Sequence, residues 1–119
     1  MKTYVLSFLF VLASGFMFSQ ENNSEFVELD NGLVEATYYH DNGSIEQQGT
    51  FKDGLLHGAW TSFDRNGNKV AMGNYVKGKK TGKWFFWSDT SLKEVDYVDS
   101  RIVSVHEWKD KNKLAIRNR

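Results

Sequence analysis

A 24-residue repeat constrains the fold of this chain more than any other feature of its sequence. Eight glycines recur at that step, pairing Gly43 with Gly67, Gly49 with Gly73, Gly54 with Gly78, and Gly58 with Gly82. The aromatic residues keep the same step: Phe51 matches Tyr75, Trp60 matches Trp84, and Tyr39, Phe63 and Trp87 form a series of three. A period of this length indicates supersecondary units that bury their apolar faces against one another.

Each copy of the repeat is predicted to be a β-hairpin. Asn-Gly and Asp-Gly pairs favour tight turns because these residue types tolerate positive φ angles. Between the turns the chain is rich in Val, Thr, Tyr, Phe and Trp, and we expect strands near 34–40, 45–52, 59–63, 68–76, 83–88, 92–98 and 102–108. One hairpin cannot bury its aromatic face alone. We therefore predict an all-β fold in which tandem antiparallel β-hairpin repeats of about 24 residues form an elongated, twisted meander sheet.

The first 19 residues have the pattern of a secretory signal peptide. Lys2 is followed by a mostly apolar stretch, Tyr4 to Phe18, and the sequence becomes polar after Ser19. An uncleaved membrane anchor is the alternative, but the apolar stretch is short against the roughly 20 residues of a spanning helix. We expect cleavage after Ser19 and a secreted or periplasmic location for the mature protein.

The remainder divides into a repeat array and two atypical ends. Asp30-Asn31-Gly32 begins a degenerate copy, and residues 97–101 resemble residues 75–79 at a step of 22, with the glycine lost. Stacked repeats need atypical end copies as caps. We expect an N-terminal cap and degenerate repeat at 20–36, hairpin repeats at 37–101, and a C-terminal strand with a basic tail at 102–119.

The two clear copies share a pattern with a known family. The order aromatic-x-x-Gly-x-x-x-Gly-x-Trp, followed by another aromatic residue and an Asn-Gly turn, resembles the MORN repeat, and in particular its bacterial, antitoxin-like variant. The matching residues are Phe51, Gly54, Gly58, Trp60 and Phe63, then Tyr75, Gly78, Gly82, Trp84 and Trp87. The resemblance covers roughly residues 37–101. It implies an interaction module, in some members one that acts at membranes, and a secretory signal fits poorly with neutralising a cytosolic toxin.

Most chemical functions lack the residues they need. The formal net charge is zero, which gives no case for a nucleic-acid binder, and the chain has no cysteine. His40, His57 and His106 lack metal-ligand spacing, and no serine lies in a Gly-x-Ser-x-Gly elbow. The glycines do not form a phosphate-binding loop. We therefore predict no catalytic residues, no metal and no cofactor.

Two features stand out as a candidate binding surface. The first is the lysine run Lys77, Lys79, Lys80 and Lys83, whose counterparts in the preceding copy are Asp53, Leu55, Leu56 and Ala59. It indicates either an anionic ligand or a solvated turn that prevents edge pairing. The second is Phe85 and Phe86, which replace Thr61 and Ser62 and make this strand apolar on both faces. One of these faces either meets a cap or is exposed as a contact surface.

These features favour a secreted or periplasmic, non-catalytic module that binds another protein of the cell envelope. The alternative is binding to a membrane surface or anionic lipid through the lysine run, and a carbohydrate hydrolase is a third hypothesis. Charge is uneven along the chain, since residues 20–50 carry seven acidic side chains and no basic one, whereas residues 76–119 carry eleven basic and six acidic side chains. The sequence does not specify an oligomeric state.

Overall fold

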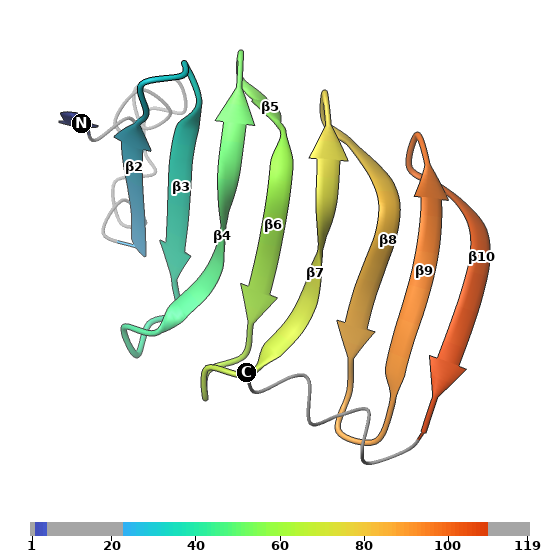
Figure 1. The fold of residues 1–119 in the computed structure, drawn as a ribbon. Coiled ribbons are helices and arrows are strands. Elements are labelled where there is room, and N and C mark those ends of the chain that lie inside the picture. The colour runs from blue at the N-terminus through green and yellow to red at the C-terminus, as the bar shows by residue number, and fades with distance from the viewer. Residues whose placement is uncertain (1, 5–22, 110–119) are drawn as a thin grey trace, which may run out of the picture.

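Within residues 2–4 and 23–109, which the computed structural model describes, the chain forms one antiparallel sheet (Figure 1). Its ten strands are β1 (Lys2–Tyr4), β2 (Ser24–Glu28), β3 (Val34–Tyr39), β4 (Ile45–Lys52), β5 (Leu55–Leu56), β6 (Gly58–Phe63), β7 (Lys69–Val76), β8 (Lys79–Trp87), β9 (Leu92–Val98) and β10 (Arg101–Trp108). The strands lie side by side in chain order, except that β5 pairs only with β4. The predicted all-β meander of tandem hairpins is confirmed.

The expected strand positions agree with the structure except at three places. β8 begins at Lys79, four residues before the expected start, because residues on the turn side of Gly82 continue to pair with β7. The short strand β5 precedes β6 and pairs with the end of β4. β2 was not expected, and it pairs with β3 along its whole length, from Ser24 to Glu28. The predicted signal peptide falls largely outside the described residues, which include only Lys2–Tyr4 of it, paired with β2 as β1.

Two kinds of turn join the strands. Three two-residue turns, Asp53-Gly54, Lys77-Gly78 and Asp99-Ser100, have positive φ at both positions, as a type I′ hairpin turn requires. At the opposite end of the sheet, the β3–β4 and β6–β7 loops end in glycine, and the loop before Ser44 is closed by a 2.8 Å bond from the His40 amide to the Ser44 carbonyl. The β8–β9 loop at that end lacks glycine and is closed by a 3.0 Å bond from the Ser88 amide to the Ser91 carbonyl. The degenerate third copy therefore keeps the turn geometry after losing its glycine, with Ser100 at a φ of 67°.

Gly58 and Gly82 lie just after the two-residue turns and have φ angles of 88° and 70°. We expect that valine at either position will lower the free energy of unfolding by about 2 kcal/mol, because a β-branched residue is strained at positive φ. Gly58→Val should be the more harmful, since its Cβ would also lie 3.0 Å from Thr50 Oγ1. Chemical denaturation measures the effect, with Ala59→Val in the regular strand as the control. Unchanged stability in both glycine variants would contradict the assignment.

Two other glycines, Gly49 and Gly73, do not form turns. Both are buried in the middle of strands, and a Cβ atom at Gly49 would lie 2.1–2.4 Å from three ring atoms of Trp60. Gly73 stands in the same relation to Trp84, at 2.0–2.4 Å. Each indole therefore lies flat on the backbone of a glycine, which is how a large ring becomes almost fully buried on a single sheet. Glycine at these positions provides space for the core.

The indole nitrogens fix the orientation of these two rings. Trp60 Nε1 donates a hydrogen bond of 2.9 Å to the Thr50 carbonyl, and Trp84 Nε1 donates one of 3.0 Å to the Asn74 carbonyl. Thr50 and Asn74 are equivalent in the repeat, so the two hairpins contain the same unit of glycine, tryptophan and carbonyl. Trp60, Trp84 and Trp87 are all buried.

The two end copies replace this unit with other residues. In the first hairpin, Phe26 on β2 faces Ala36 on β3. The large residue therefore comes before the small one, which reverses the order of glycine and tryptophan in the regular units. In the last hairpin, Val95 occupies the position of Gly73 and pairs with Val105 on β10. Since Val95 fills the space above its strand, no indole can lie there. The array therefore ends in differently packed copies on both sides.

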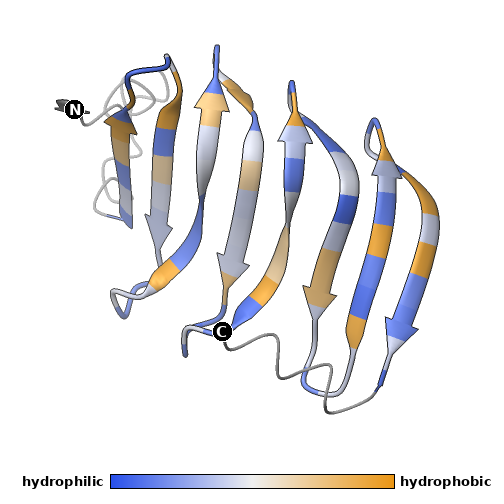
Figure 2. Cartoon of the chain, in the orientation of Figure 1, coloured by the Kyte–Doolittle hydropathy of each residue, from blue (hydrophilic) through white to orange (hydrophobic). Residues whose placement is uncertain are grey.

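Alternation along the strands gives the sheet two distinct faces, visible as alternating colours along β9 in Figure 2. The aromatic face carries Phe51, Trp60, Tyr75, Trp84 and Tyr97, which are in ring contact across the strands. The opposite face carries Lys83, Phe85, Trp87, Glu94 and Asp96, as the β8–β9 register requires.

The last strand, β10, is the most exposed part of the sheet. Ile102, Val103 and Val105 have 50–60% of their surface exposed. The pairing of β10 with β9 is interrupted at Val103, because Ile102 pairs with Tyr97 and Ser104 pairs with the next residue of β9, Asp96. Val103 is therefore the extra residue of a β-bulge.

Candidate binding site

The aromatic face has a regular construction in which flat and upright rings alternate. The Trp60 ring is nearly perpendicular to Phe51, at 83°, and to Tyr75, at 88°. The Trp84 ring is likewise nearly perpendicular to Tyr75, at 81°, and to Tyr97, at 80°. Because each indole lies flat on a glycine, the flanking rings stand upright from the sheet. They form two neighbouring slots, which we call the first slot (Phe51, Trp60, Tyr75) and the second slot (Tyr75, Trp84, Tyr97).

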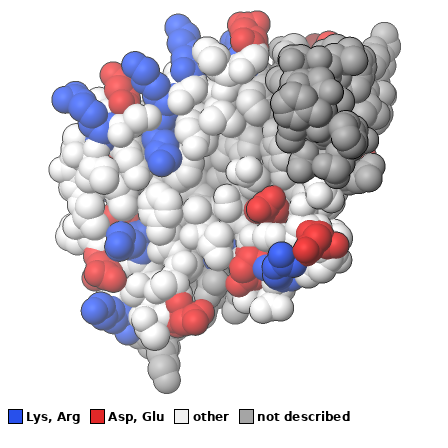
Figure 3. Space-filling view, turned by 180° about the vertical axis from the view of Figure 1, so that it is seen from behind, with Lys and Arg blue, Asp and Glu red and all other residues white. Residues whose placement is uncertain are grey.

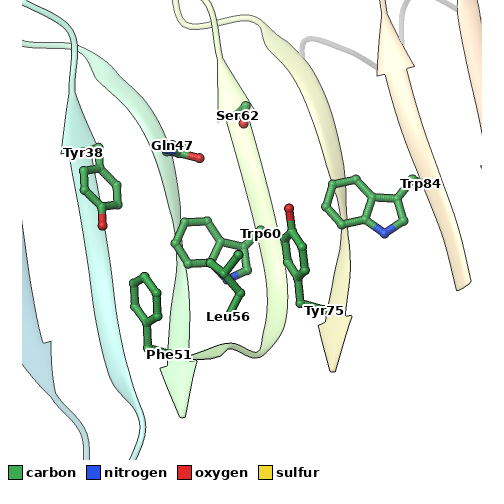
Figure 4. Close-up of a pocket in the computed structure, with 8 residues that line it drawn as sticks. All are labelled: Tyr38, Gln47, Phe51, Leu56, Trp60, Ser62, Tyr75 and Trp84. Atoms are coloured by element: carbon green, nitrogen blue, oxygen red, sulfur yellow. The ribbon is translucent and has the colours of Figure 1, made fainter. Parts of the chain in front are cut away.

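The first slot opens into a pocket of about 170 Å³ (Figure 4). It is lined by Tyr38, Gln47, Phe51, Leu56, Trp60, Ser62, Tyr75 and Trp84. No lining residue carries a charge. Within the described part of the chain, the side-chain polar groups of Tyr38, Gln47, Ser62 and Tyr75 have no hydrogen-bonding partner. The pocket therefore offers apolar ring surface together with four polar groups that are free to bind a ligand.

Burial affects the two tyrosines of the pocket. It raises the pKa of the Tyr38 phenol above its ordinary value of 10.0. Burial is also the main cause that raises the pKa of Tyr75, with a smaller contribution from Tyr97. Both hydroxyls therefore stay protonated near neutral pH and can donate as well as accept hydrogen bonds.

The second slot is occupied by a side chain of the protein itself. Lys80 Nζ lies 5.4 Å from the centroid of the Trp84 ring and 5.2 Å from that of Tyr97. Both distances are within the range of a cation–π interaction. In the first slot the equivalent residue is Leu56, which lines the pocket.

The structure does not bring the six predicted surface residues together into one patch. Lys77 and Lys79 are exposed at the β7–β8 turn, whereas Lys80 covers the second slot. Phe85 stacks on Trp87 on the opposite face, with ring centroids 6.1 Å apart. Phe86 stacks on Trp84 on the aromatic face, also at 6.1 Å.

Lys83 belongs to an ion-pair cluster on the opposite face. Its Nζ atom lies 2.7 Å from Glu94 Oε2 and 3.3 Å from Asp96 Oδ1. The hydrogen bond that Lys83 donates to Glu94 is the largest cause that raises the pKa of Lys83 above 10.5, followed by the bond that it donates to Asp96. The pKa of Asp96 lies below 3.8, mainly because Ser104 donates a 2.7 Å hydrogen bond to it and then because of Lys83. Lys83 therefore links side chains of β8 and β9 on the opposite face.

The lowered pKa of Asp96 predicts a contribution to acid sensitivity. The folded state favours ionised Asp96, so this stabilisation is present above the ordinary pKa of 3.8 and is lost as the pH falls through the lower pKa of the folded state. We expect the melting temperature of the wild type to fall more steeply below about pH 4 than that of Asp96→Asn. Parallel melting curves from pH 2 to 6 test this, and equal slopes would contradict it. Glu107→Gln on β10 is a suitable control.

One end of the sheet combines cations with exposed apolar residues. Lys77, Lys79 and Arg101 lie at or beside the type I′ turns. Leu55, Val76 and Val98 lie at the same end with 47–48% of their surface exposed. Figure 3 shows several Lys and Arg side chains at this end of the molecule, with Asp and Glu side chains among them.

Other kinds of site have less support from the described residues. His40 Nε2 donates a 2.9 Å hydrogen bond to the Phe63 carbonyl and so joins neighbouring hairpins. The described segments hold no cluster of three or more His, Asp or Glu side chains that could bind a metal ion. Nor does that part of the chain contain a helix with the length and apolar character needed to cross a membrane.

Sequence analysis did not single out the polar wall of the pocket. Tyr38, Ser62 and Phe86 occupy one repeat position at steps of 24, as do Gln47 and Ala71. The two later residues, Phe86 and Ala71, lack the polar groups of the earlier ones. A search for repeat positions at which a later copy lacks the polar side chain of an earlier copy could therefore have identified these polar pocket residues.

The fold and its pocket together define a tandem β-hairpin repeat protein with a small pocket on its aromatic face. Two adjacent segments, residues 34–53 and 56–77, match the family model described as MORN repeat variant, so these two hairpins are MORN-variant repeats. Such repeats often serve as binding modules and are generally non-catalytic. No curated protein sequence matches the chain. Residues 78–101 lie beyond the matched segments and keep the same ring geometry.

Proposed function

We propose that this protein is a non-catalytic interaction module, secreted or periplasmic, that binds another protein of the cell envelope through the pocket on its aromatic face. The observation that supports this function is the free polar wall of the pocket. Four polar groups without protein partners stand beside aromatic rings, an arrangement that suits an anchoring side chain of a partner. The signal-peptide pattern of residues 1–19 supports the location.

The size of the pocket fits this kind of binding. A volume of about 170 Å³ suits one side chain rather than a whole cofactor or drug-sized ligand, for which pockets of roughly 300 Å³ or more are usual. Interfaces of this kind depend on a few anchors inserted into well-packed sites. The rest of the aromatic face would then exclude water around the anchor.

Site-specific photocrosslinking tests this proposal. A photoreactive amino acid at Ser62 lies at the pocket, and the same group at Thr61 lies on the opposite face of the same strand. We expect position 62 to capture one recurrent envelope protein and position 61 to capture none. Equal capture from both positions, or capture from position 61 alone, would contradict the proposal.

A second candidate function is binding to an anionic membrane surface. It is favoured by Leu55, Val76 and Val98, which are exposed at the same end of the sheet as the turn lysines. Apolar tips next to basic side chains suit the interface of an anionic bilayer. Only Lys77 and Lys79 of the predicted lysine run are free for this role, because Lys80 covers aromatic rings and Lys83 is ion-paired. Unchanged binding of Lys77→Glu/Lys79→Glu to phosphatidylglycerol vesicles would exclude it.

A further inference from the structure

The two slots on the aromatic face have equivalent walls and floors but different occupants. Each has an indole floor between two upright rings, and in the second slot Lys80 Nζ lies over the indole and beside Tyr97. The first slot has Leu56 at the position of Lys80. A leucine side chain ends well short of the position that a lysine ammonium reaches. Leu56 therefore does not fill, in the first slot, the place that the Lys80 ammonium group occupies in the second.

We infer that the first slot binds an ammonium group, supplied by a lysine side chain of the partner protein. The inference rests on the proposed function, in which the pocket takes the partner, and it names the group that is bound. Aromatic rings attract cations through the negative potential of their faces, and several rings around one site form a cage for an ammonium group. Here Tyr38 and Trp84 also line the pocket, beside the three rings of the first slot.

The charge distribution around the first slot also suits a cation. The pocket lining carries no charged side chain, and the strand carboxylates Glu25 and Glu35 lie on the opposite face of the sheet. The second slot instead holds the ammonium group of Lys80. A cationic side chain would therefore meet no like charge in the first slot, whereas the second is already filled by one. The four polar groups of the pocket can accept hydrogen bonds from the three ammonium hydrogens.

The equivalence of the slots provides the test. The probe is a capped Gly-Lys-Gly peptide, followed through the indole N–H signals of Trp60 and Trp84 in NMR spectra. The matched control peptide has norleucine, which has a similar shape and no charge. We expect one site in the wild type, sensed by Trp60, and about tenfold weaker binding of the norleucine peptide. Equal binding of the two peptides would overturn the inference.

Two reciprocal substitutions exchange the occupants of the slots. Leu56→Lys should fill the first slot with an internal ammonium group and abolish peptide binding. Lys80→Leu should empty the second slot and raise the stoichiometry from one site to two, with the new site sensed by Trp84. Each new residue already occurs at the equivalent position of the other repeat, so both variants should fold. Unchanged stoichiometry in Lys80→Leu together with normal binding by Leu56→Lys would overturn the inference.

Two further results separate this inference from the function on which it rests. If Leu56→Lys still crosslinks the same protein from position 62, the interaction module remains and the ammonium group is excluded as its anchor. If phosphatidylcholine vesicles bind more tightly than the peptide and lose binding with Leu56→Lys, the ammonium source is a lipid, which overturns the assignment to a protein partner. The expected result is that these vesicles do not bind.

Discussion

Gly73→Ala should strongly destabilise the protein, although it adds only one methyl group. The new Cβ would lie 2.0 Å from an atom of the Trp84 ring, a distance that real Cβ atoms do not show. The indole cannot simply move away, because its Nε1 atom donates a hydrogen bond to the backbone carbonyl of Asn74 and its ring contacts Tyr75 and Tyr97. We expect a loss of about 3 kcal/mol in the free energy of unfolding, at the upper end of overpacking effects. Urea denaturation followed by circular dichroism measures it.

Two companion variants define the cause of this loss. Asn74→Ala, the neighbouring residue on the exposed side of the same strand, should change the stability by less than about 0.5 kcal/mol. Gly73→Val combined with Trp84→Val should recover part of the stability of Gly73→Val, because the last hairpin already contains a valine pair at this level, Val95 and Val105. If Gly73→Ala is as stable as the wild type, the indole does not lie on this glycine.

Trp60→Ala is expected to have a comparable effect for the opposite reason. It would remove a side chain that is only 6% exposed and leave a cavity above Gly49 among Phe26, Ala36 and Phe51. It would also take the indole donor away from the Thr50 carbonyl. Losses of about 3–5 kcal/mol are usual when a buried tryptophan is truncated to alanine.

The matched control is another tryptophan truncation. Trp108→Ala lies at the end of the exposed strand β10, and we expect it to cost about 1 kcal/mol or less. Both variants can be compared by thermal unfolding at the same pH. A small effect of Trp60→Ala, equal to that of Trp108→Ala, would mean that the aromatic face is not the core of the sheet.

The sequence was sufficient to predict the hairpin array. The 24-residue step located the turns, and the expected strands at 45–52 and 92–98 coincide with β4 and β9. It could not separate the two roles of glycine, because Gly49 and Gly58 both recur at the same step, although one lies under an indole and the other has positive φ. The distinction depends on which side chain crosses from the neighbouring strand, and this follows from the register.

The candidate site was less accessible to sequence reasoning. Lys77, Lys80 and Lys83 are close in sequence, but the register places Lys80 over aromatic rings and Lys83 between two carboxylates. The pocket residues come from several strands and carry no charge that would mark them. Strand β2 was also missed, because its pairing with β3 depends on Phe26 packing over Ala36, a contact outside the regular repeat.

The bulge at Val103 determines what can be added to the C-terminal edge of the sheet. One extra residue exchanges the faces to which the following side chains point, so Ile102 and Val105 face the same side although they are three residues apart. A regular strand laid along β10 could match its alternation on only one side of the bulge. The chain contains no proline to block edge pairing. A bulged edge of this kind is a poorer template for the addition of another strand than a regular edge would be.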